Sequence, residues 1–374
     1  HVVFKIDSTQ STASDRVKIY VNGQQETSLS NSTYPNQNDD LAFGTSSYNM
    51  YIGNYEGSNY YYDGSMSHLH FCDGYAYEPT EFGSVDATTG EWKINAAPNV
   101  SYGNQGFLIL KDGNTITDQS SNSNNFSSNG TGVTKTEDNP SNVFATLNPL
   151  QNHNGATLSH GNTFTTKSGA HAIVPATLAC GWPGAPSTAK FYWETKAESA
   201  EPRTVGLIKS SLPTNSSWYN DYMGANSGGD GTMGHYIGTY VTATTSHWEY
   251  NGQSAQTPSP QVGFSVGDIM NHAYDASTGK YWQGKNGVWF TYGGGVGDPA
   301  NGNYPIFTAN ATDRLHDIFP AESSYDGRWS WNFGNGYFKT TAVSSAGTNA
   351  SNLGIFEYDV PTGFTALCTK GYNL

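Results

Sequence analysis

Apolar and polar residues alternate with a period of two along several short segments of the chain. Residues 13–24 (ASDRVKIYVNGQ) place Val17, Ile19 and Val21 at every second position. Because successive side chains of a strand point to opposite faces of a sheet, this pattern predicts a half-buried strand with these three residues on its apolar face. The dipeptide Asn22-Gly23 that follows is typical of a tight hairpin turn.

The same alternation recurs in the second half of the chain. Residues 190–197 (KFYWETKA) place Phe191 and Trp193 on one face of a strand and Glu194 on the other. Residues 262–292 predict three strands separated by two turns, with Asn286-Gly287 as a hairpin turn. Further strands are predicted at residues 48–54, 60–74, 103–112, 204–208, 329–338 and 363–369.

Residues 113–143 break the alternation. They are rich in Asn, Ser, Thr and Gly and contain few apolar residues, which is typical of a loop or a connector between domains. Phe144, Leu147 and Leu150 come directly afterwards, and we expect them to anchor the connector.

These patterns predict an all-β chain of two antiparallel β-sandwich modules of the jelly-roll type. The first module covers residues 1–112, a polar connector covers 113–155, and the second module covers 156–374. The composition supports many short strands joined by tight turns, since charged residues make up only 13% of the chain and there are 43 Gly and 25 Tyr.

Charge, hydropathy and cysteine content restrict the partners that we expect and the state of the thiols. The formal net charge of −14 repels phosphate backbones, so we expect no nucleic-acid partner. No run of about 20 apolar residues exists, so we expect no membrane insertion. Cys72, Cys180 and Cys368 are predicted to be free thiols, with a Cys180–Cys368 disulfide as the alternative. The chain opens at His1 inside a strand-like run, and we expect it to be a fragment of a longer polypeptide.

The first module resembles the C-terminal portion of a LamG-like, concanavalin A-like jelly roll. The resemblance is carried by DRVKIYVNG at 15–23, IGN at 52–54, YDGSMSHLHFCDG at 62–74 and TTGEW at 88–92. It implies that the N-terminal strands of that jelly roll precede His1.

The second module resembles a SPRY domain. The resemblance is carried by KFYWETK at 190–196, VGLIKSS at 205–211, VGFSVGDI at 262–269, TGKYWQGKNGVW at 278–289, WNFGNGYF at 331–338 and PTGFTALCT at 361–369. One departure is the polar pair Asn271-His272, where a more apolar strand is expected.

The order of the two modules is similar to that in virion proteins of marine tailed phages. The resemblance implies a fibre or capsid-decoration subunit at the virion surface, which is an extracellular location. It also implies self-association or contact with other virion proteins.

Catalytic motifs are scarce in the sequence. It holds neither a GxSxG nucleophile elbow nor an HExxH zinc motif, and we find no acidic pair two or four residues apart on one strand, as a retaining glycosidase would need. GGGVGD at 293–298 superficially resembles a phosphate loop but lacks the GK[ST] ending. We therefore expect no enzymatic activity.

Metal binding is a weaker hypothesis. His68 and His70 share one strand face at a spacing that can bind a metal ion, although no third ligand is evident. Asp39, Asp63 and Asp73 are candidate ligands for a structural Ca²⁺ ion, as loop aspartates on LamG-like jelly rolls are. The alternative is that these aspartates bind the backbone of their own turns. No other cofactor is predicted.

The surplus of aromatic residues points to ligand binding. Sugar sites on β-sandwiches combine Trp or Tyr faces with Asn, Asp and Gly. The candidate binding residues lie in predicted edge loops of the second module, namely Trp218, Tyr219, Tyr222, Tyr236, Trp248 and Tyr250. The alternative is that these aromatics pack a core or an inter-subunit interface.

We therefore predict a non-catalytic virion surface protein that binds a glycan or a protein of the host cell surface. One alternative is a secreted or cell-surface carbohydrate-binding adhesin of a bacterium. Another is a purely architectural assembly subunit.

Overall fold

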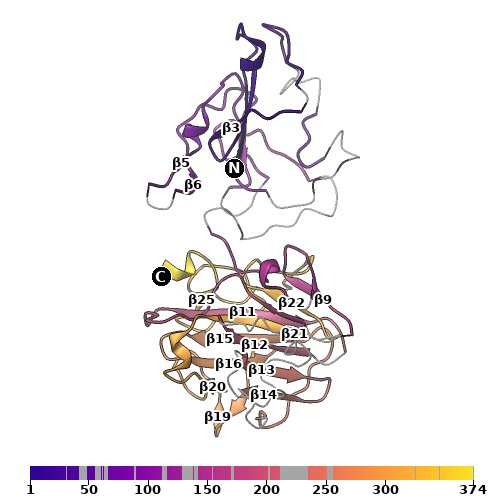
Figure 1. Ribbon diagram of the computed structural model, residues 1–374, viewed down its shortest axis with the longest axis vertical. Helices are drawn as coiled ribbons and strands as arrows, with labels where there is room; N and C mark the ends of the chain where they lie inside the picture. Colours follow the sequence, from indigo (N-terminus) through magenta and orange to yellow (C-terminus); the bar gives the residue numbers. More distant parts are fainter. Residues whose placement is uncertain are drawn as a thin grey trace. The chain divides into compact units, whose positions relative to one another are not determined.

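The computed structural model describes most of the chain. The residues that it does not describe are 31, 42–48, 55–59, 61, 63–65, 88–89, 112–115, 129–137, 139–141, 154, 170–171, 201–202, 211–234, 251–255, 325, 345 and 374. The chain forms two compact units, the first from His1–Lys135 and Asn139–Ser141, the second from Thr136–Asp138 and Asn142–Leu374. Each unit is built from strands and short 3-10 turns, and the prediction of an all-β fold is confirmed (Figure 1). No helix in the described part of the chain is long and apolar enough to cross a membrane.

The described residues of the first unit form three small antiparallel sheets. One has the order β1 (Val2–Ile6), β2 (Val17–Val21), β3 (Gln24–Glu26). The others pair β4 (Leu69–Phe71) with β7 (Phe107–Ile109) and β5 (Gly83–Val85) with β6 (Trp92–Ile94). The 3-10 turns are η1 (Ala13–Asp15) and η2 (Pro79–Glu81).

Two predictions for the first unit are wrong. The described residues at 49–54 form no strand. Strand β2 forms as predicted but with its faces reversed, because Tyr20 is buried whereas Val21 is 46% exposed. The large Tyr20 ring packs inward with its hydroxyl 3.4 Å from a carboxylate oxygen of Glu78, so its polar end keeps a partner.

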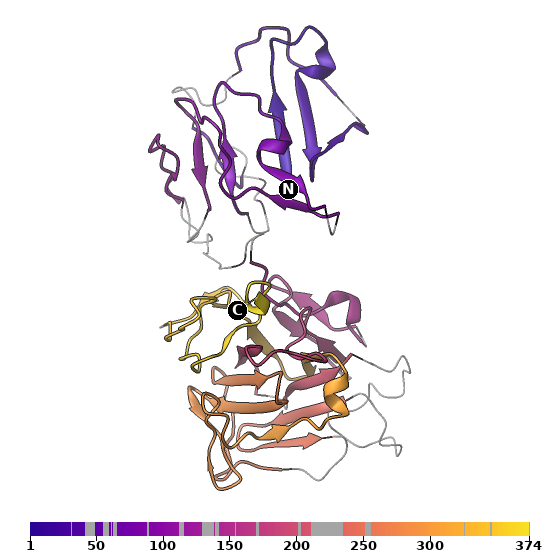
Figure 2. The same ribbon diagram turned by 90° about the vertical axis from the view of Figure 1, so that its left-hand side faces the viewer.

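The second unit is a sandwich of two large sheets (Figure 2). The five-stranded sheet has the order β10 (Ala172–Pro175), β21 (Ile318–Ser324), β12 (Arg203–Lys209), β13 (His235–Val241), β14 (Ser246–Tyr250). The nine-stranded sheet runs β17 (Val288–Trp289), β16 (Lys280–Lys285), β15 (Ile269–Asp275), β11 (Lys190–Ala197), β22 (Trp329–Asn332), β9 (Phe164–Thr166), β8 (Thr157–Ser159). In addition, β20 (Phe307–Thr308) pairs with β16, and β25 (Thr365–Ala366) pairs in parallel with β11.

The smaller elements of the second unit decorate this sandwich. They are the hairpins β18 (Thr291–Tyr292)–β19 (Gly295–Val296) and β23 (Tyr337–Phe338)–β24 (Thr341–Ala342), with the 3-10 turns η3 (Pro149–Gln151), η5 (Asp313–Leu315) and η6 (Gly371–Asn373).

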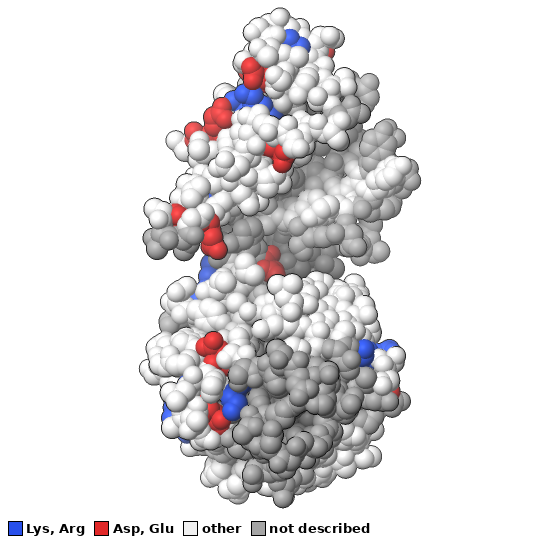
Figure 3. All heavy atoms as spheres, viewed as in Figure 1, with Lys and Arg blue, Asp and Glu red and all other residues white. Residues whose placement is uncertain are grey.

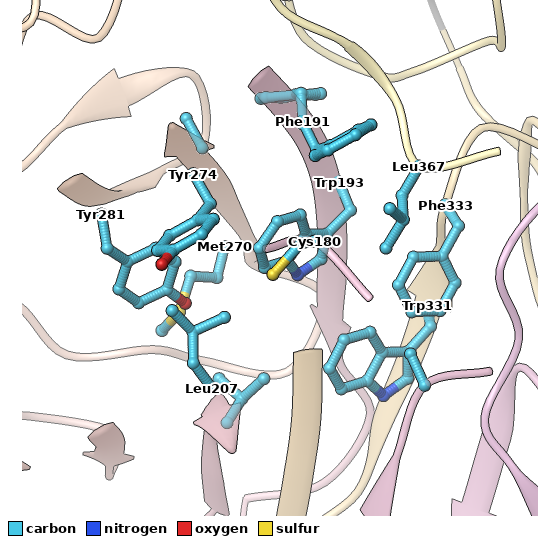
Figure 4. Packing of buried hydrophobic residues seen from close by; sticks show 14 of the residues in the cluster. Cys180, Phe191, Trp193, Leu207, Met270, Tyr274, Tyr281, Trp331, Phe333 and Leu367 are labelled. Carbon is cyan, nitrogen blue, oxygen red and sulfur yellow. The ribbon is translucent and has the colours of Figure 1, made fainter. Parts of the chain in front are cut away.

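Large aromatic side chains fill the space between the two sheets. Figure 4 shows Trp193, Tyr274 and Tyr281 of the nine-stranded sheet packed near Leu207 of the five-stranded sheet. Strand β11 is buried along almost its whole length on both faces, because the C-terminal residues cover the face that carries Glu194. The predicted alternation of β11 is therefore confirmed, but its polar face is interior rather than solvated.

Residues of the predicted connector are divided between the two units. Asp118 accepts the backbone N–H of Leu108 at 2.9 Å, and Phe126 packs edge-on against Phe107 in the first unit. Phe144 and Leu147 are buried in the core of the second unit. Leu150, expected as a third anchor, is 93% exposed.

All three cysteines are free thiols. Cys180 and Cys368 are buried in the second unit, so the predicted free state is confirmed and the alternative disulfide does not form. Burial raises the pKa of the Cys180 thiol, which keeps it protonated and unreactive.

Candidate binding surface

The predicted binding residues fall into three groups in the structure. Trp218, Tyr219 and Tyr222 lie outside the described residues. Tyr236 lies in strand β13 and Tyr250 in strand β14, but their side chains are also outside what the structure describes. Trp248 is described in full and lies in strand β14 rather than in a loop.

Trp248 is a core residue. Its side chain is 2% exposed, stacks on Phe290 with ring centroids 6.5 Å apart, and meets Tyr292 edge-on at 5.2 Å. Its backbone exchanges two hydrogen bonds of 2.9 Å with Gln256, whose side chain accepts the Tyr292 hydroxyl at 3.2 Å. The alternative that these aromatics pack a core therefore holds for Trp248, whose ring also contacts Tyr292.

The exposed aromatic residue near Tyr292 is Tyr304. Strands β18 and β19 form a hairpin in which Tyr292 lies directly opposite Gly295. A Cβ atom at Gly295 would lie 2.4 Å from a ring carbon of Tyr304, so the Tyr304 ring occupies the place of the missing side chain. Because directly opposite residues of an antiparallel pair point to the same face, Tyr292 and the Tyr304 ring lie on one face of the hairpin.

Tyr304 is held in an uncommon backbone conformation. Its φ is +47°, in the left-handed region that a bulky residue rarely adopts, and its side chain is 46% exposed. Conformations of this kind are retained when the surrounding structure enforces them, and they gather at functional sites. The position therefore presents an aromatic face to solvent in a fixed orientation.

The loop before Tyr304 is anchored from the sandwich. Asp298 and Asn303 exchange backbone hydrogen bonds of 3.0 Å. Beneath them, the indole N–H of buried Trp282 donates to the Asn303 carbonyl at 2.7 Å, and the Lys280 ammonium donates to the Gly302 carbonyl at 2.7 Å. The loop is thus fixed by two side chains of strand β16.

Polar side chains lie on the same loop as Tyr304. The Asp298 carboxylate accepts the side-chain amide of Asn301 at 2.8 Å and its backbone N–H at 3.2 Å. These hydrogen bonds from Asn301 hold the pKa of Asp298 below its usual range, so the carboxylate stays charged. Asn301 and Asn303 are exposed. We call Tyr304, Asp298, Asn301 and Asn303, with the hairpin under them, the Tyr304 surface.

The sequence did not single out Tyr304 as a binding residue. The available signal was GGGVGD at 293–298, which resembles a phosphate loop only superficially. Gly295 in this run is required by the close approach of the Tyr304 ring rather than by a phosphate. Such an approach depends on a residue nine positions away, which local patterning does not reveal.

The described candidate metal ligands form hydrogen bonds with other groups of the protein. Asp39 accepts the backbone N–H of Asn36 in its own turn at 2.6 Å, whereas Asp73 accepts that of Gln105 in a neighbouring loop at 3.1 Å. Asp63 lies outside the described residues. His70 Nδ1 lies 2.9 Å from the Tyr102 hydroxyl, and burial lowers the pKa of His70 to about 4. Within the described ranges, no three His, Cys, Asp or Glu residues gather where they could hold a metal ion.

The most strongly shifted acids lie in the interior of the sandwich. Burial raises the pKa of both Glu194 and Glu322 to about 7. Glu194 accepts the backbone N–H groups of Glu357 and Tyr358, each at 2.9 Å. Glu322 accepts the Thr165 hydroxyl and, at 2.6 Å, the Trp331 indole N–H. Their oxygens are therefore engaged by the protein itself.

The polar pair Asn271-His272 is equally interior. Asn271 donates to the Tyr192 hydroxyl at 2.6 Å and accepts the backbone N–H of Gly287 at 2.8 Å. The His272 ring stacks on Trp193 with centroids 5.2 Å apart, and its Nδ1 lies 2.8 Å from the Tyr281 hydroxyl. Strand β15 can therefore bury polar side chains because each finds a partner.

Comparisons with known proteins find similarity at the level of solved structures. No family model matches the chain, and no curated protein matches it. The SPRY domain of human HERC1 is 15% identical with a TM-score of 0.33, and the match covers 50% of this chain and 96% of that domain. The PSpry domain of TRIM65 is 14% identical with a TM-score of 0.33, covering 50% of this chain and 91% of that one.

A third similar structure is that of stonustoxin. It is 13% identical with a TM-score of 0.34, and the match covers 50% of this chain but only 28% of that one. The first two structures are named SPRY domains, the family that the motifs at 190–369 resemble. The strand order of the second unit itself shows that this unit is an antiparallel β-sandwich.

Proposed function

We propose that the chain is a non-catalytic surface protein of a virion, a fibre or capsid-decoration subunit, whose second unit binds a glycan of the host cell surface. The observation that carries the binding proposal is Tyr304, a half-exposed aromatic ring held over Gly295 in a left-handed conformation. A left-handed backbone costs free energy in a bulky residue, and such residues gather at functional sites. This favours a function that depends on the fixed orientation of the Tyr304 ring.

The chemistry of the Tyr304 surface favours a sugar. An aromatic face packs against the C–H groups of a pyranose ring, while carboxylate and amide side chains bind its hydroxyls. Asp298, Asn301 and Asn303 supply those polar groups on the same anchored loop.

The charge of the protein favours an uncharged glycan. The chain carries a net charge of −14, and one of its negative charges, the ionised Asp298, lies on the Tyr304 surface. The face of the molecule in Figure 3 carries few charged side chains. Because like charges repel, an anionic polysaccharide would be disfavoured at low salt. We therefore propose a neutral polysaccharide as the ligand.

Substitution of Tyr304 by Asn tests this proposal. Asn removes the ring but tolerates the left-handed backbone, so Tyr304→Asn keeps the fold and its melting temperature. We expect loss of retention on neutral host-surface polysaccharide in affinity electrophoresis. The control is Leu315→Asn, which removes an exposed apolar side chain in η5, away from the Tyr304 loop in the sequence. Equal retention of Tyr304→Asn and the wild type would reject the Tyr304 surface as the binding site.

A purely architectural role is the second candidate, and it is favoured by one observation. Val2 and Val21 lie opposite each other on β1 and β2, and both are exposed, as is Phe4 on the same face. An architectural subunit would bind no polysaccharide yet assemble into a symmetric oligomer. Analytical ultracentrifugation and immunogold labelling of intact virions separate that role from a freely secreted adhesin, which would bind glycan without being part of a particle.

A further inference from the structure

A second aromatic platform lies in the first unit. Tyr75 is 50% exposed and stacks on Tyr77, with ring centroids 5.5 Å apart and planes within 10°. The two residues are two positions apart in an extended segment, which directs their side chains to the same side. Tyr75 thus packs against Tyr77 while half of its surface stays exposed.

Tyr77 is fixed by the rest of the unit. Its hydroxyl accepts the backbone N–H of Ser101 at 2.9 Å. Its ring packs edge-on against the buried ring of Phe82, which in turn packs against His70. The orientation of Tyr75 is therefore set by a chain of ring contacts that leads into the core, which lowers the entropy lost when a ligand stacks on it.

The loop at 101–105 lies against the segment that carries Asp73 and Tyr77. Asp73 donates its backbone N–H to the Tyr102 carbonyl at 2.9 Å and accepts that of Gln105 through Oδ2. The two segments approach so closely that a Cβ at Gly103 would lie 2.1 Å from the Asp73 carbonyl oxygen. Ser101, Asn104 and Gln105 on this loop are exposed.

From these observations we infer that the first unit carries its own sugar-binding subsite, with Tyr75 as the stacking face and the loop at 101–105 as the hydroxyl-binding rim. The ligand class is that of the proposed function, a neutral polysaccharide, but the site and its residues are separate from the Tyr304 surface. The loop supplies a hydroxyl and amides, and Asp73 beside it supplies a carboxylate; these groups fit sugar hydroxyls better than they fit an apolar protein surface.

Two subsites on one chain have a measurable consequence. A polysaccharide repeats the same ring many times, so one polymer can engage both subsites and the second contact becomes intramolecular. A short oligosaccharide cannot gain in this way. We therefore expect binding of two tetrasaccharides per chain and much tighter binding of the polymer than of the tetrasaccharide.

The test uses the full chain and a panel of neutral polymers: glucan, mannan, galactan and xylan, with their tetrasaccharides. Tyr75→Ala is compared with Tyr51→Ala, which removes a tyrosine of similar exposure in the same unit. On the polymer that the wild type retains, we expect Tyr75→Ala to weaken binding at least about tenfold through lost avidity. Calorimetry with the tetrasaccharide should fall from two sites to one, whereas Tyr51→Ala should match the wild type.

The outcomes separate the two proposals. If Tyr75→Ala binds like the wild type while Tyr304→Asn does not, the subsite in the first unit is rejected and the proposed function stands. If only Tyr75→Ala loses binding, the subsite stands and the Tyr304 surface is rejected. If the wild type retains no polymer of the panel, both are overturned, and capture of a host surface protein through Tyr75 would show that the platform serves a protein partner instead.

Discussion

The ring of Tyr304 fills the position that a side chain at residue 295 would require, because a Cβ at Gly295 would come within 2.4 Å of it. Gly295 and Tyr304 are therefore coupled, because the Tyr304 ring can keep this position only while residue 295 has no side chain. This pairing makes it possible to disturb the proposed binding surface without touching its polar groups.

We predict that Gly295→Ala weakens polysaccharide binding as strongly as Tyr304→Asn does, at little cost in stability. The colliding atoms are at the far end of the Tyr304 side chain, which can turn away, so the melting temperature should change little. The double variant Gly295→Ala/Tyr304→Gly relieves the collision and should keep the wild-type melting temperature without regaining the lost binding. Binding by Gly295→Ala at the wild-type level would contradict the placement of the ring.

Trp248→Ala should act on stability rather than directly on a ligand. Removing a buried Trp from a well-packed core costs about 3–5 kcal/mol of unfolding free energy. Trp248→Phe keeps an aromatic ring against Phe290 and Tyr292 and should cost clearly less. Urea denaturation followed by intrinsic fluorescence measures both. A stable Trp248→Ala protein that had lost only binding would restore the original interpretation of this residue as a ligand contact.

Glu194→Gln should destabilise the second unit. The glutamine amide offers one acceptor where the carboxylate offers two, so a backbone N–H of Glu357 or Tyr358 loses its partner. A buried donor left unsatisfied costs about 1–3 kcal/mol. Glu198→Gln is the control, because Glu198 forms an ion pair with Lys339 nearer the surface, and such pairs contribute about 0–1 kcal/mol. Similar losses in the two variants would argue against a special role of Glu194.

The stability of the second unit should rise as the pH falls from 7 to about 5. Burial raises the pKa of Glu194 and Glu322 to about 7 from 4.5, so between these values the folded state binds more protons than the unfolded state. Stability is then fully present below the unfolded pKa and is lost as the pH rises toward 7. Buried His272, whose pKa is lowered to about 3 from 6.5, and His153, whose pKa is also lowered by burial, act in the opposite direction and reduce this gain in stability.

Below pH 4.5 the balance reverses, because both carboxyls are then protonated in either state while His272 still resists protonation in the folded protein. Thermal unfolding followed by tryptophan fluorescence isolates this unit, since eight of the nine tryptophans belong to it. Glu322→Gln should flatten the profile between pH 5 and 7. A melting temperature that rises steadily from pH 5 to 7 would contradict the assignment.

The positions of the strands were largely predictable from the sequence. Which face of a strand is buried was not. The alternation in residues 190–197 predicts β11 with its bounds as observed, because period-two patterning is a local property. Tyr20 and Val21 show what period-two patterning does not decide. Both are compatible with either face of β2, and the choice depends on Glu78, which lies far away in the sequence.

The candidate site was predictable in kind but not in its residues. The surplus of aromatics and the abundance of Asn and Gly indicated an aromatic binding surface, yet Trp248 lies in a strand and is buried. Tyr304 was missed because its exposure follows from the hairpin β18–β19 and from Trp282 beneath the loop. These are tertiary relationships, and a single sequence does not display them.

The link between β11 and the C-terminal residues bears on how the protein is made. Strand β11 pairs with β25, and its Glu194 obtains its backbone donors from residues more than 160 positions later. A nascent chain on the ribosome therefore cannot complete this sandwich until residues 357–366 have emerged. Chains that end before residue 357 would lack two backbone donors of the buried Glu194 carboxylate and the strand that pairs in parallel with β11.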